Sequence, residues 1–195
     1  MPNFERGFKT WAENISSSIR KELGIKPHDP LPVNALANHL KIILFVPNDI
    51  SEVPNECLKQ LLEKDPGGWS ATTFHIGDRA VIIYNPKHSK KRQASDVMHE
   101  FSHILCNHEL AQIILSVDGS IVMKSFDKKQ EDEAAWLSGC LLLPRAALLH
   151  IKFNRIDDET ASNLYCVTND MLRYRVNVSG VNYVMSRIKK NYAKK

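Results

Sequence analysis

The sequence predicts an α+β fold in which a small sheet packs on one helix and the C-terminal part is mostly helical. Apolar residues recur every three or four positions near both ends of the chain, as in amphipathic helices. Two strand-like segments, residues 70–76 and 79–84, are joined by Gly77-Asp78, a two-residue hairpin signal. Another helical pattern, free of glycine and proline over residues 95–107, follows the hairpin directly. We therefore expect the sheet to cover that helix.

The length of 195 residues fits one domain with a sizeable core. We expect a single domain over residues 1–195 without internal repeats. Its parts are an N-terminal region of helices and one strand (1–65), a central region with the hairpin (66–150) and C-terminal helices (151–195).

The N-terminal region opens with an amphipathic helix that Gly24 ends. A second helix is expected over residues 32–40, a strand over 42–46 and a third helix over 51–64. The apolar positions that define the first helix are Phe4, Phe8, Trp11, Ile15, Ile19 and Leu23.

The central region continues after the hairpin with the helix of residues 95–107, and then with a short strand or loop over 119–125. A further helical pattern begins near Gln130 and stops at Pro144. The C-terminal region is predicted to hold three helices, over residues 157–165, 168–175 and 179–192, with Ser179 as the N-cap of the last.

The helix after the hairpin carries the run His99-Glu100-Phe101-Ser102-His103. Positions i and i+4 lie on one face of an α-helix, so two neutral imidazoles placed there can hold one zinc ion. Glu100 then lies beside the metal, where it can take a proton from a bound water. A surface helix with two solvated histidines is the alternative. A buried apolar stripe around the motif argues against it, formed by Ala94, Val97, Met98, Phe101, Ile104 and Leu105.

The next helical pattern begins with three carboxylates, Glu131, Asp132 and Glu133. Acidic residues in the first turn favour the helix dipole, which accounts for Asp132. A catalytic zinc ion usually takes three protein ligands and leaves one position for water. One of the two glutamates is therefore the candidate third ligand.

Together, these two helices resemble the ImmA/IrrE family of metallopeptidases. In that family an HExxH helix is followed by a helix of the form E-x-E-A-N-x-F-A-x-x-L-L-x-P. The matching positions here are Glu131, Glu133, Ala134, Leu141, Leu142 and Pro144. Looser similarity extends to residues 19–25, 68–70 and 82–85 and to Arg92.

The resemblance implies a zincin-like metallopeptidase fold with His99, His103 and Glu131 as the zinc ligands. Glu133 is the alternative third ligand, and Glu100 is implied as the general base. By the same resemblance the chain is a zinc-dependent endopeptidase. Its substrate would be a protein, typically a transcriptional repressor or another helix-turn-helix regulator, so that cleavage regulates transcription.

Three positions depart from the family pattern. Ala135 replaces the usual Asn or Asp, Ser102 replaces Gly or Ala, and Leu137 replaces Phe. A polar residue at position 135 could orient a ligating histidine, a role worth about 10–100-fold in metal affinity or activity. Ala135 and Ser102 motivate the alternative hypothesis: a catalytically weak or inactive protein of this fold that acts by binding a regulator.

The composition excludes several other classes. Hydrophobic residues make up 43% and charged residues 25% of the chain, and no apolar stretch approaches 18 residues, so no membrane span is expected. The net charge of +4 is mild, and we do not expect direct nucleic-acid binding, although residues 168–192 could suggest a helix-turn-helix. The absence of a signal-peptide pattern in residues 1–9 and the lack of CxxC spacing predict a cytoplasmic location.

Other side chains are candidates for supporting roles. His108 follows His103 by five residues, which turns it away from the metal face of a regular helix, so we expect a role behind the ligands or at the surface. Residues 69–75 are the candidate edge strand that receives an extended peptide. The candidate donors to a tetrahedral oxyanion are His150, Tyr84, Arg173 and Tyr174.

Overall fold

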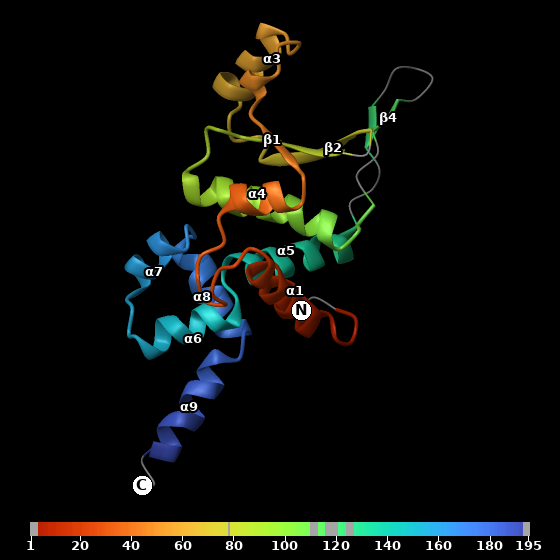
Figure 1. Cartoon of the computed structure of the whole chain (residues 1–195). Helices are drawn as coiled ribbons and strands as arrows, with labels where there is room; N and C mark the ends of the chain where they lie inside the picture. The colour runs from red at the N-terminus through yellow and green to blue at the C-terminus, as the bar shows by residue number, and fades with distance from the viewer. Residues whose placement is uncertain (1–3, 78, 110–112, 116–120, 124–126, 193–195) are drawn as a thin grey trace.

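The computed structural model describes residues 4–77, 79–109, 113–115, 121–123 and 127–192. The fold is α+β, as predicted, with a small sheet on one side of a central helix and further helices on the other side (Figure 1). The helices are α1 (Phe8–Glu22), α2 (Val33–His39), α3 (Asn55–Lys59), α4 (Lys90–Leu105), α5 (Lys128–Leu142), α6 (Arg145–Phe153), α7 (Asp158–Leu164), α8 (Asn169–Val178) and α9 (Val181–Tyr192). The strands are β1 (Ile43–Phe45), β2 (Ala71–Ile76), β3 (Arg79–Tyr84), β4 (Ile113–Leu115) and β5 (Ile121–Met123); two helical turns, η1 (Pro47–Asp49) and η2 (Gln60–Lys64), complete the list.

The main sheet has the strand order β1-β3-β2, which leaves β2 at an edge. β1 pairs parallel with β3, and β2 pairs antiparallel with β3, as the predicted hairpin requires. Gly77 adopts a φ of 58°, a left-handed conformation that glycine supplies without a steric penalty in a tight turn. Asp78, the other predicted turn residue, lies outside the described residues.

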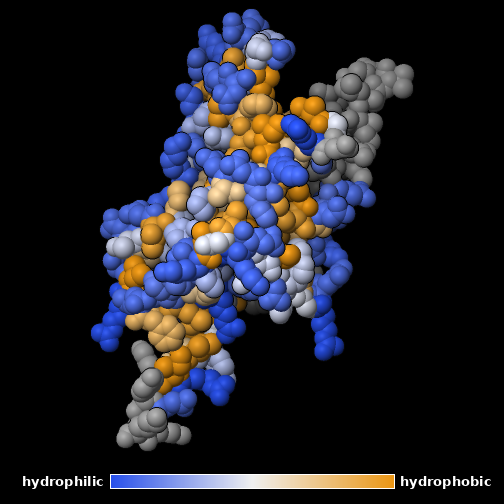
Figure 2. Space-filling model, in the orientation of Figure 1, coloured by the Kyte–Doolittle hydropathy of each residue, from blue (hydrophilic) through white to orange (hydrophobic). Residues whose placement is uncertain are grey.

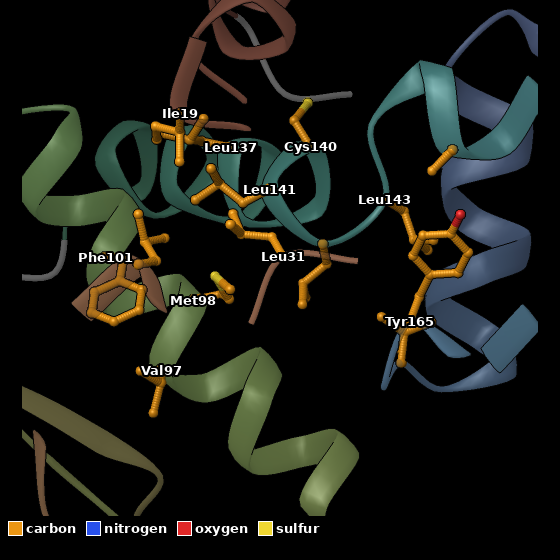
Figure 3. Packing of buried hydrophobic residues seen from close by; sticks show 14 of the residues in the cluster. Ile19, Leu31, Val97, Met98, Phe101, Leu137, Cys140, Leu141, Leu143 and Tyr165 are labelled. Carbon is orange, nitrogen blue, oxygen red and sulfur yellow. The ribbon is translucent and has the colours of Figure 1, made fainter. Parts of the chain in front are cut away.

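Helix α4 is the centre of the molecule. The sheet covers one side of it, as expected, and α5 packs against the other (Figure 1). Met98 and Phe101 of α4 meet Leu137 and Leu141 of α5, and all four side chains are fully buried (Figure 3). Ile19 of α1 joins this core from the far side of α5. Burial of an apolar side chain of this size contributes about 1.5–3 kcal/mol, so this core fixes α4 and α5 relative to each other.

Two buried arginines hold the C-terminal end of α5. The Arg20 guanidinium donates to the Leu141 carbonyl at 2.8 Å and to the Ser16 hydroxyl at 2.7 Å. Arg175 donates to the Leu143 carbonyl at 3.2 Å and to Glu13 Oε1 at 2.7 Å. The last carbonyls of a helix have no partner within it, and these side chains provide one. Burial lowers the pKa of Arg20 to about 10, and Arg20 stays charged at neutral pH.

The structure differs from the sequence prediction in three helices. Ser179, the predicted N-cap of the last helix, is instead the C-cap of α8, and α9 begins at Val181. The helix predicted over 51–64 begins only at Asn55, because Pro54 disfavours the α conformation in the residue before it. Helix α6 was not predicted. Pro144 was interpreted as a stop signal for α5. It is also the N-cap of α6, which begins at Arg145. Of the predicted segment 119–125, Ile121–Met123 forms β5, which pairs with β4, and the rest lies outside the described residues.

Helix α9 projects away from the helical layers (Figure 1). Val181 at its start is buried, whereas Tyr183 is 66% exposed. Apolar side chains remain visible along this helix at the lower end of the molecule in Figure 2.

No single described helix is both long enough and apolar enough to cross a membrane. Helices α5 and α6 pass that test only as a pair bent by 44°, on length and composition alone.

Candidate metal centre

Helix α4 presents His99 and His103 on one face, one turn apart. The helix starts at a side-chain cap, since the Ser89 hydroxyl accepts a hydrogen bond from the Arg92 backbone N–H at 3.3 Å. Its apolar face is buried against the sheet and α5, and this fixes its rotation. The His99 side chain is 30% exposed and that of His103 14%, so both are reachable from solvent.

Helix α5 brings Glu131 to the two histidines. Asp127 caps the helix, and its Oδ1 accepts from the Lys129 backbone N–H at 2.8 Å, which sets Glu131 in the first turn. Glu131 Oε2 lies 3.0 Å from His99 Nε2, and Glu131 Oε1 lies 3.5 Å from His103 Nε2. The two Nε2 atoms are 3.0 Å apart. Two imidazole nitrogens and one carboxylate therefore converge on one point.

This group has the composition and size of a three-ligand metal site. One ligand atom from each of the three residues lies within 4.8 Å of the others. With ligand bonds of about 2.0–2.1 Å, neighbouring ligands of a tetrahedral metal ion are about 3.3 Å apart. The observed separations of 3.0, 3.0 and 3.5 Å bracket that value. The three residues fit a small divalent cation with little movement of their side chains.

Glu100 lies on the neighbouring face of α4, beneath the edge strand β2. Its Oε2 accepts a hydrogen bond from the Thr73 hydroxyl at 2.5 Å. Burial raises the pKa of Glu100, and the hydrogen bond from Thr73 and the nearby His99 oppose that shift. A carboxylate with a raised pKa is a stronger base than one in water.

Glu133, the alternative third ligand in the sequence analysis, points elsewhere. Its Oε2 lies 3.2 Å from His108 Nε2, and His108 Nδ1 lies 3.0 Å from His103 Nδ1. Helix α4 ends at Leu105, and Asn107 turns the chain back through a φ of 54°, which Asn tolerates better than most residues. His108 therefore lies behind His103, on the side away from the converging nitrogens.

Burial also affects the free imidazole of His103. It lowers the pKa of His103 from 6.5 to about 4, with His99 and His108 acting in the same direction. The ring is neutral at physiological pH, and a neutral ring is the form that binds metal. Ala135, one turn after Glu131, is exposed and offers no polar side-chain atom to the site.

Two of the four candidate oxyanion donors, His150 and Arg173, make side-chain contacts away from the converging group. The His150 ring stacks on the His28 ring with a centroid distance of 4.2 Å, and Arg173 Nε lies 3.7 Å from Asp158 Oδ2. Tyr174 is 45% exposed, and Tyr84 pairs with Ala71 at the end of the hairpin. None of these contacts is with a residue of the converging group.

Two supporting contacts were not foreseen from the sequence. Thr73 alternates inward on β2, but nothing local marks it as the partner of Glu100, 27 residues later. The pairing of His108 with Glu133 depends on the left-handed turn at Asn107 and on the packing of α4 against α5. The Asn107-His108 pair directly after the helix was the only available signal.

Comparison with known proteins adds a family. A model of the peptidase M78 family, described as the IrrE N-terminal-like domain, matches residues 59–177, more than half of the chain. The matched region contains β2, β3, α4 and α5, and so all residues of the converging group. No significant match was found among curated proteins or among solved structures.

Proposed function

This chain belongs to the peptidase M78 family, and we propose that it is a zinc-dependent endopeptidase that cleaves a protein substrate. Membership indicates a metallopeptidase-type hydrolase with a zincin-like fold. The observation that carries the proposal for this particular chain is the convergence of His99, His103 and Glu131 beside the buried carboxylate of Glu100.

His99, His103 and Glu131 would hold the metal, and the nitrogen-rich ligand set favours zinc. A bound zinc ion supplies a water whose pKa is lowered to about 7, and it polarises the scissile carbonyl. The three side chains leave the solvent side of the group open for water and substrate, since His99 and Glu131 are both about one-third exposed.

Glu100 is proposed as the general base. It follows His99 directly on α4, and its raised pKa suits a group that first accepts a proton and then releases it. Thr73 fixes one carboxylate oxygen, Oε2, which leaves Oε1 to accept the proton of the attacking water. The same carboxylic acid then delivers the proton to the leaving amine.

Strand β2 is the proposed receptor for the peptide. The Ser70 carbonyl accepts from the Asn85 N–H at 2.8 Å, so residues at even positions of β2 face β3 with their backbone groups. The backbone N–H and C=O groups of Ala71, Thr73 and His75 therefore point to the free edge. An extended peptide added there would lie beside Glu100, because the Thr73 side chain contacts it.

The proposed substrate is a DNA-binding transcriptional regulator, such as a helix-turn-helix repressor. The support for this choice is the resemblance to the ImmA/IrrE family. We propose no direct nucleic-acid role for the chain itself, whose net charge is +4.

The test is the variant Glu100→Gln, which keeps the shape of the side chain and removes the base. Cleavage of peptides from a digested proteome, followed by mass spectrometry, should fall by about 10²–10⁴-fold while zinc stoichiometry stays the same. The matched control is Glu63→Gln, which changes an exposed carboxylate on η2 and should leave cleavage unchanged. Full cleavage by Glu100→Gln would refute the role of the base. Zinc binding without cleavage by the unmodified protein would favour a regulator-binding protein instead.

A further inference from the structure

We propose that His108 and Glu133 are positioning residues that lock His103 into the tautomer and orientation in which it binds the metal. The inference rests on the proposed metal site. It adds two residues that are not ligands, one from the turn after α4 and one from α5. Together with His103 they form a relay of contacts that runs from Glu133 through His108 to His103.

The relay is a sequence of hydrogen bonds that passes through the imidazole rings of His103 and His108. His103 Nε2 faces His99 and Glu131, and His103 Nδ1 lies 3.0 Å from His108 Nδ1. The other nitrogen of His108, Nε2, lies 3.2 Å from Glu133 Oε2. Each imidazole therefore uses both nitrogens, and the relay ends on the carboxylate of Glu133.

When His103 binds a metal ion, only one placement of protons satisfies every contact. A metal on His103 Nε2 requires a lone pair there, so the ring proton is on Nδ1. That proton is donated to His108 Nδ1, which must accept, and His108 carries its own proton on Nε2. The Glu133 carboxylate accepts this second proton. With His108 neutral and Glu133 ionised, the relay thus favours the tautomer of His103 that binds the metal.

The relay is buried. The His108 side chain is 6% exposed and that of Glu133 13%. Burial and the nearby Glu133 raise the pKa of the neighbouring thiol of Cys106 to about 12. Hydrogen bonds that end on a charged group in such surroundings are stronger than neutral ones in water. Position 135 carries alanine, so the relay provides support that no polar side chain there supplies.

The test measures zinc affinity by competition with a chromophoric chelator. Zinc should bind about 10–100-fold more weakly to His108→Ala and Glu133→Leu than to the unmodified protein. Glu133→Gln keeps an oxygen that can accept from His108 Nε2 and should lose less affinity than Glu133→Leu. Unchanged affinity in both His108→Ala and Glu133→Leu would overturn the relay.

The matched control is His88→Gln. His88 Nδ1 lies 2.7 Å from Asp96 Oδ2, and the two side chains are 6% and 16% exposed. This is a second buried histidine–carboxylate pair, with Asp96 on α4 and His88 just before the helix. The contact given for this pair is not with His99, His103 or Glu131. His88→Gln should lower the stability of the fold without weakening zinc binding, which separates a local effect from a general loss of packing.

A second measurement uses the unmodified protein, in case His108→Ala does not fold. Nitrogen-15 NMR of the zinc-loaded protein should show the ring proton of His103 on Nδ1 and that of His108 on Nε2. A proton on His108 Nδ1 would contradict the relay. If the unmodified protein binds no zinc, the proposed function fails; if it binds zinc with the wrong tautomers, only the relay fails.

Discussion

The pKa of Glu100 is set mainly by two influences that act in opposite directions. Burial under β2 raises its pKa, whereas the Thr73 hydroxyl stabilises the ionised form. Thr73 also belongs to the strand proposed to receive the substrate. One side chain therefore links the proposed base to the proposed peptide-binding edge.

Replacing Thr73 with valine removes the hydroxyl at nearly constant shape. The pKa of Glu100 should rise further, since a lowering influence is lost, and the acidic limb of kcat/KM against pH should move to higher pH. We expect about a tenfold fall in kcat/KM at neutral pH, the equivalent of about 1.4 kcal/mol. Thr73→Ser keeps the donor and serves as the control. A pH profile unchanged in Thr73→Val would show that the hydrogen bond has no role in setting the base.

The free energy of unfolding of the metal-free protein should depend on His103. Its pKa is about 4 in the folded chain and 6.5 without burial, so between these values the unfolded chain binds a proton that the folded chain does not. This contribution to stability is present above pH 6.5 and is lost as the pH falls toward about 4. Urea unfolding over that window should show a weaker pH dependence for His103→Gln than for the unmodified protein. Equal slopes would contradict the burial effect.

At the level of single residues, the sequence predicted the converging group and a place for His108 behind the ligands or at the surface, but not the contacts of Thr73 with Glu100 and of Glu133 with His108. The i, i+4 spacing of His99 and His103 is a local property of a helix and needs no knowledge of the tertiary structure. The choice of Glu131 over Glu133 came from a resemblance, because both glutamates lie in the first turn of one helix. Their separation into two directions is a consequence of how α5 packs on α4.

At the level of elements, the edge position of β2 leaves backbone groups free for the proposed peptide. Its backbone groups alternate between β3 and the free edge, so two neighbouring positions differ in what a proline would remove. His75 is exposed and its N–H points to the edge, whereas the N–H of Phe74 belongs to the ladder with Val81.

Substituting proline at these two positions separates substrate binding from folding. His75→Pro should leave the melting temperature nearly unchanged and raise KM for a cleaved peptide several-fold, because one edge hydrogen bond is lost. Phe74→Pro should lower the melting temperature, since it breaks a hydrogen bond of the hairpin. Thermal unfolding and steady-state kinetics of both variants make the comparison. Unchanged KM in His75→Pro would mean that the peptide does not pair with β2 at this position.

Elements were predicted well where periodicity and punctuation agreed. The hairpin, the HExxH helix and helices α7 and α8 follow from local patterns with clear end signals. Helix α6 was missed because Pro144 reads as an end for α5, while the same residue is compatible with the start of a new helix. The sheet order could not be derived, since a parallel partner such as β1 is chosen by long-range packing.

At the level of the whole molecule, the family match and the geometry of the converging group both indicate a metallopeptidase. The family match over residues 59–177 identifies the peptidase lineage, and the geometry brings two imidazoles and a carboxylate to one point. The core between α4 and α5 holds this geometry, because the HExxH motif and the third carboxylate are on different helices (Figure 3). The proposed chemistry therefore depends on packing that joins residues 32 positions apart.

Metal removal and restoration show whether His99, His103 and Glu131 hold the ion on which cleavage depends. Peptides from a digested proteome are incubated with the purified protein before and after chelation, and products are identified by mass spectrometry. Cleavage should disappear with the metal and return with about one equivalent of zinc in the unmodified protein, but not in Glu131→Ala. Cleavage that persists after complete metal removal would show that the reaction needs no metal ion, and full restoration by zinc in Glu131→Ala would show that Glu131 is not a required ligand.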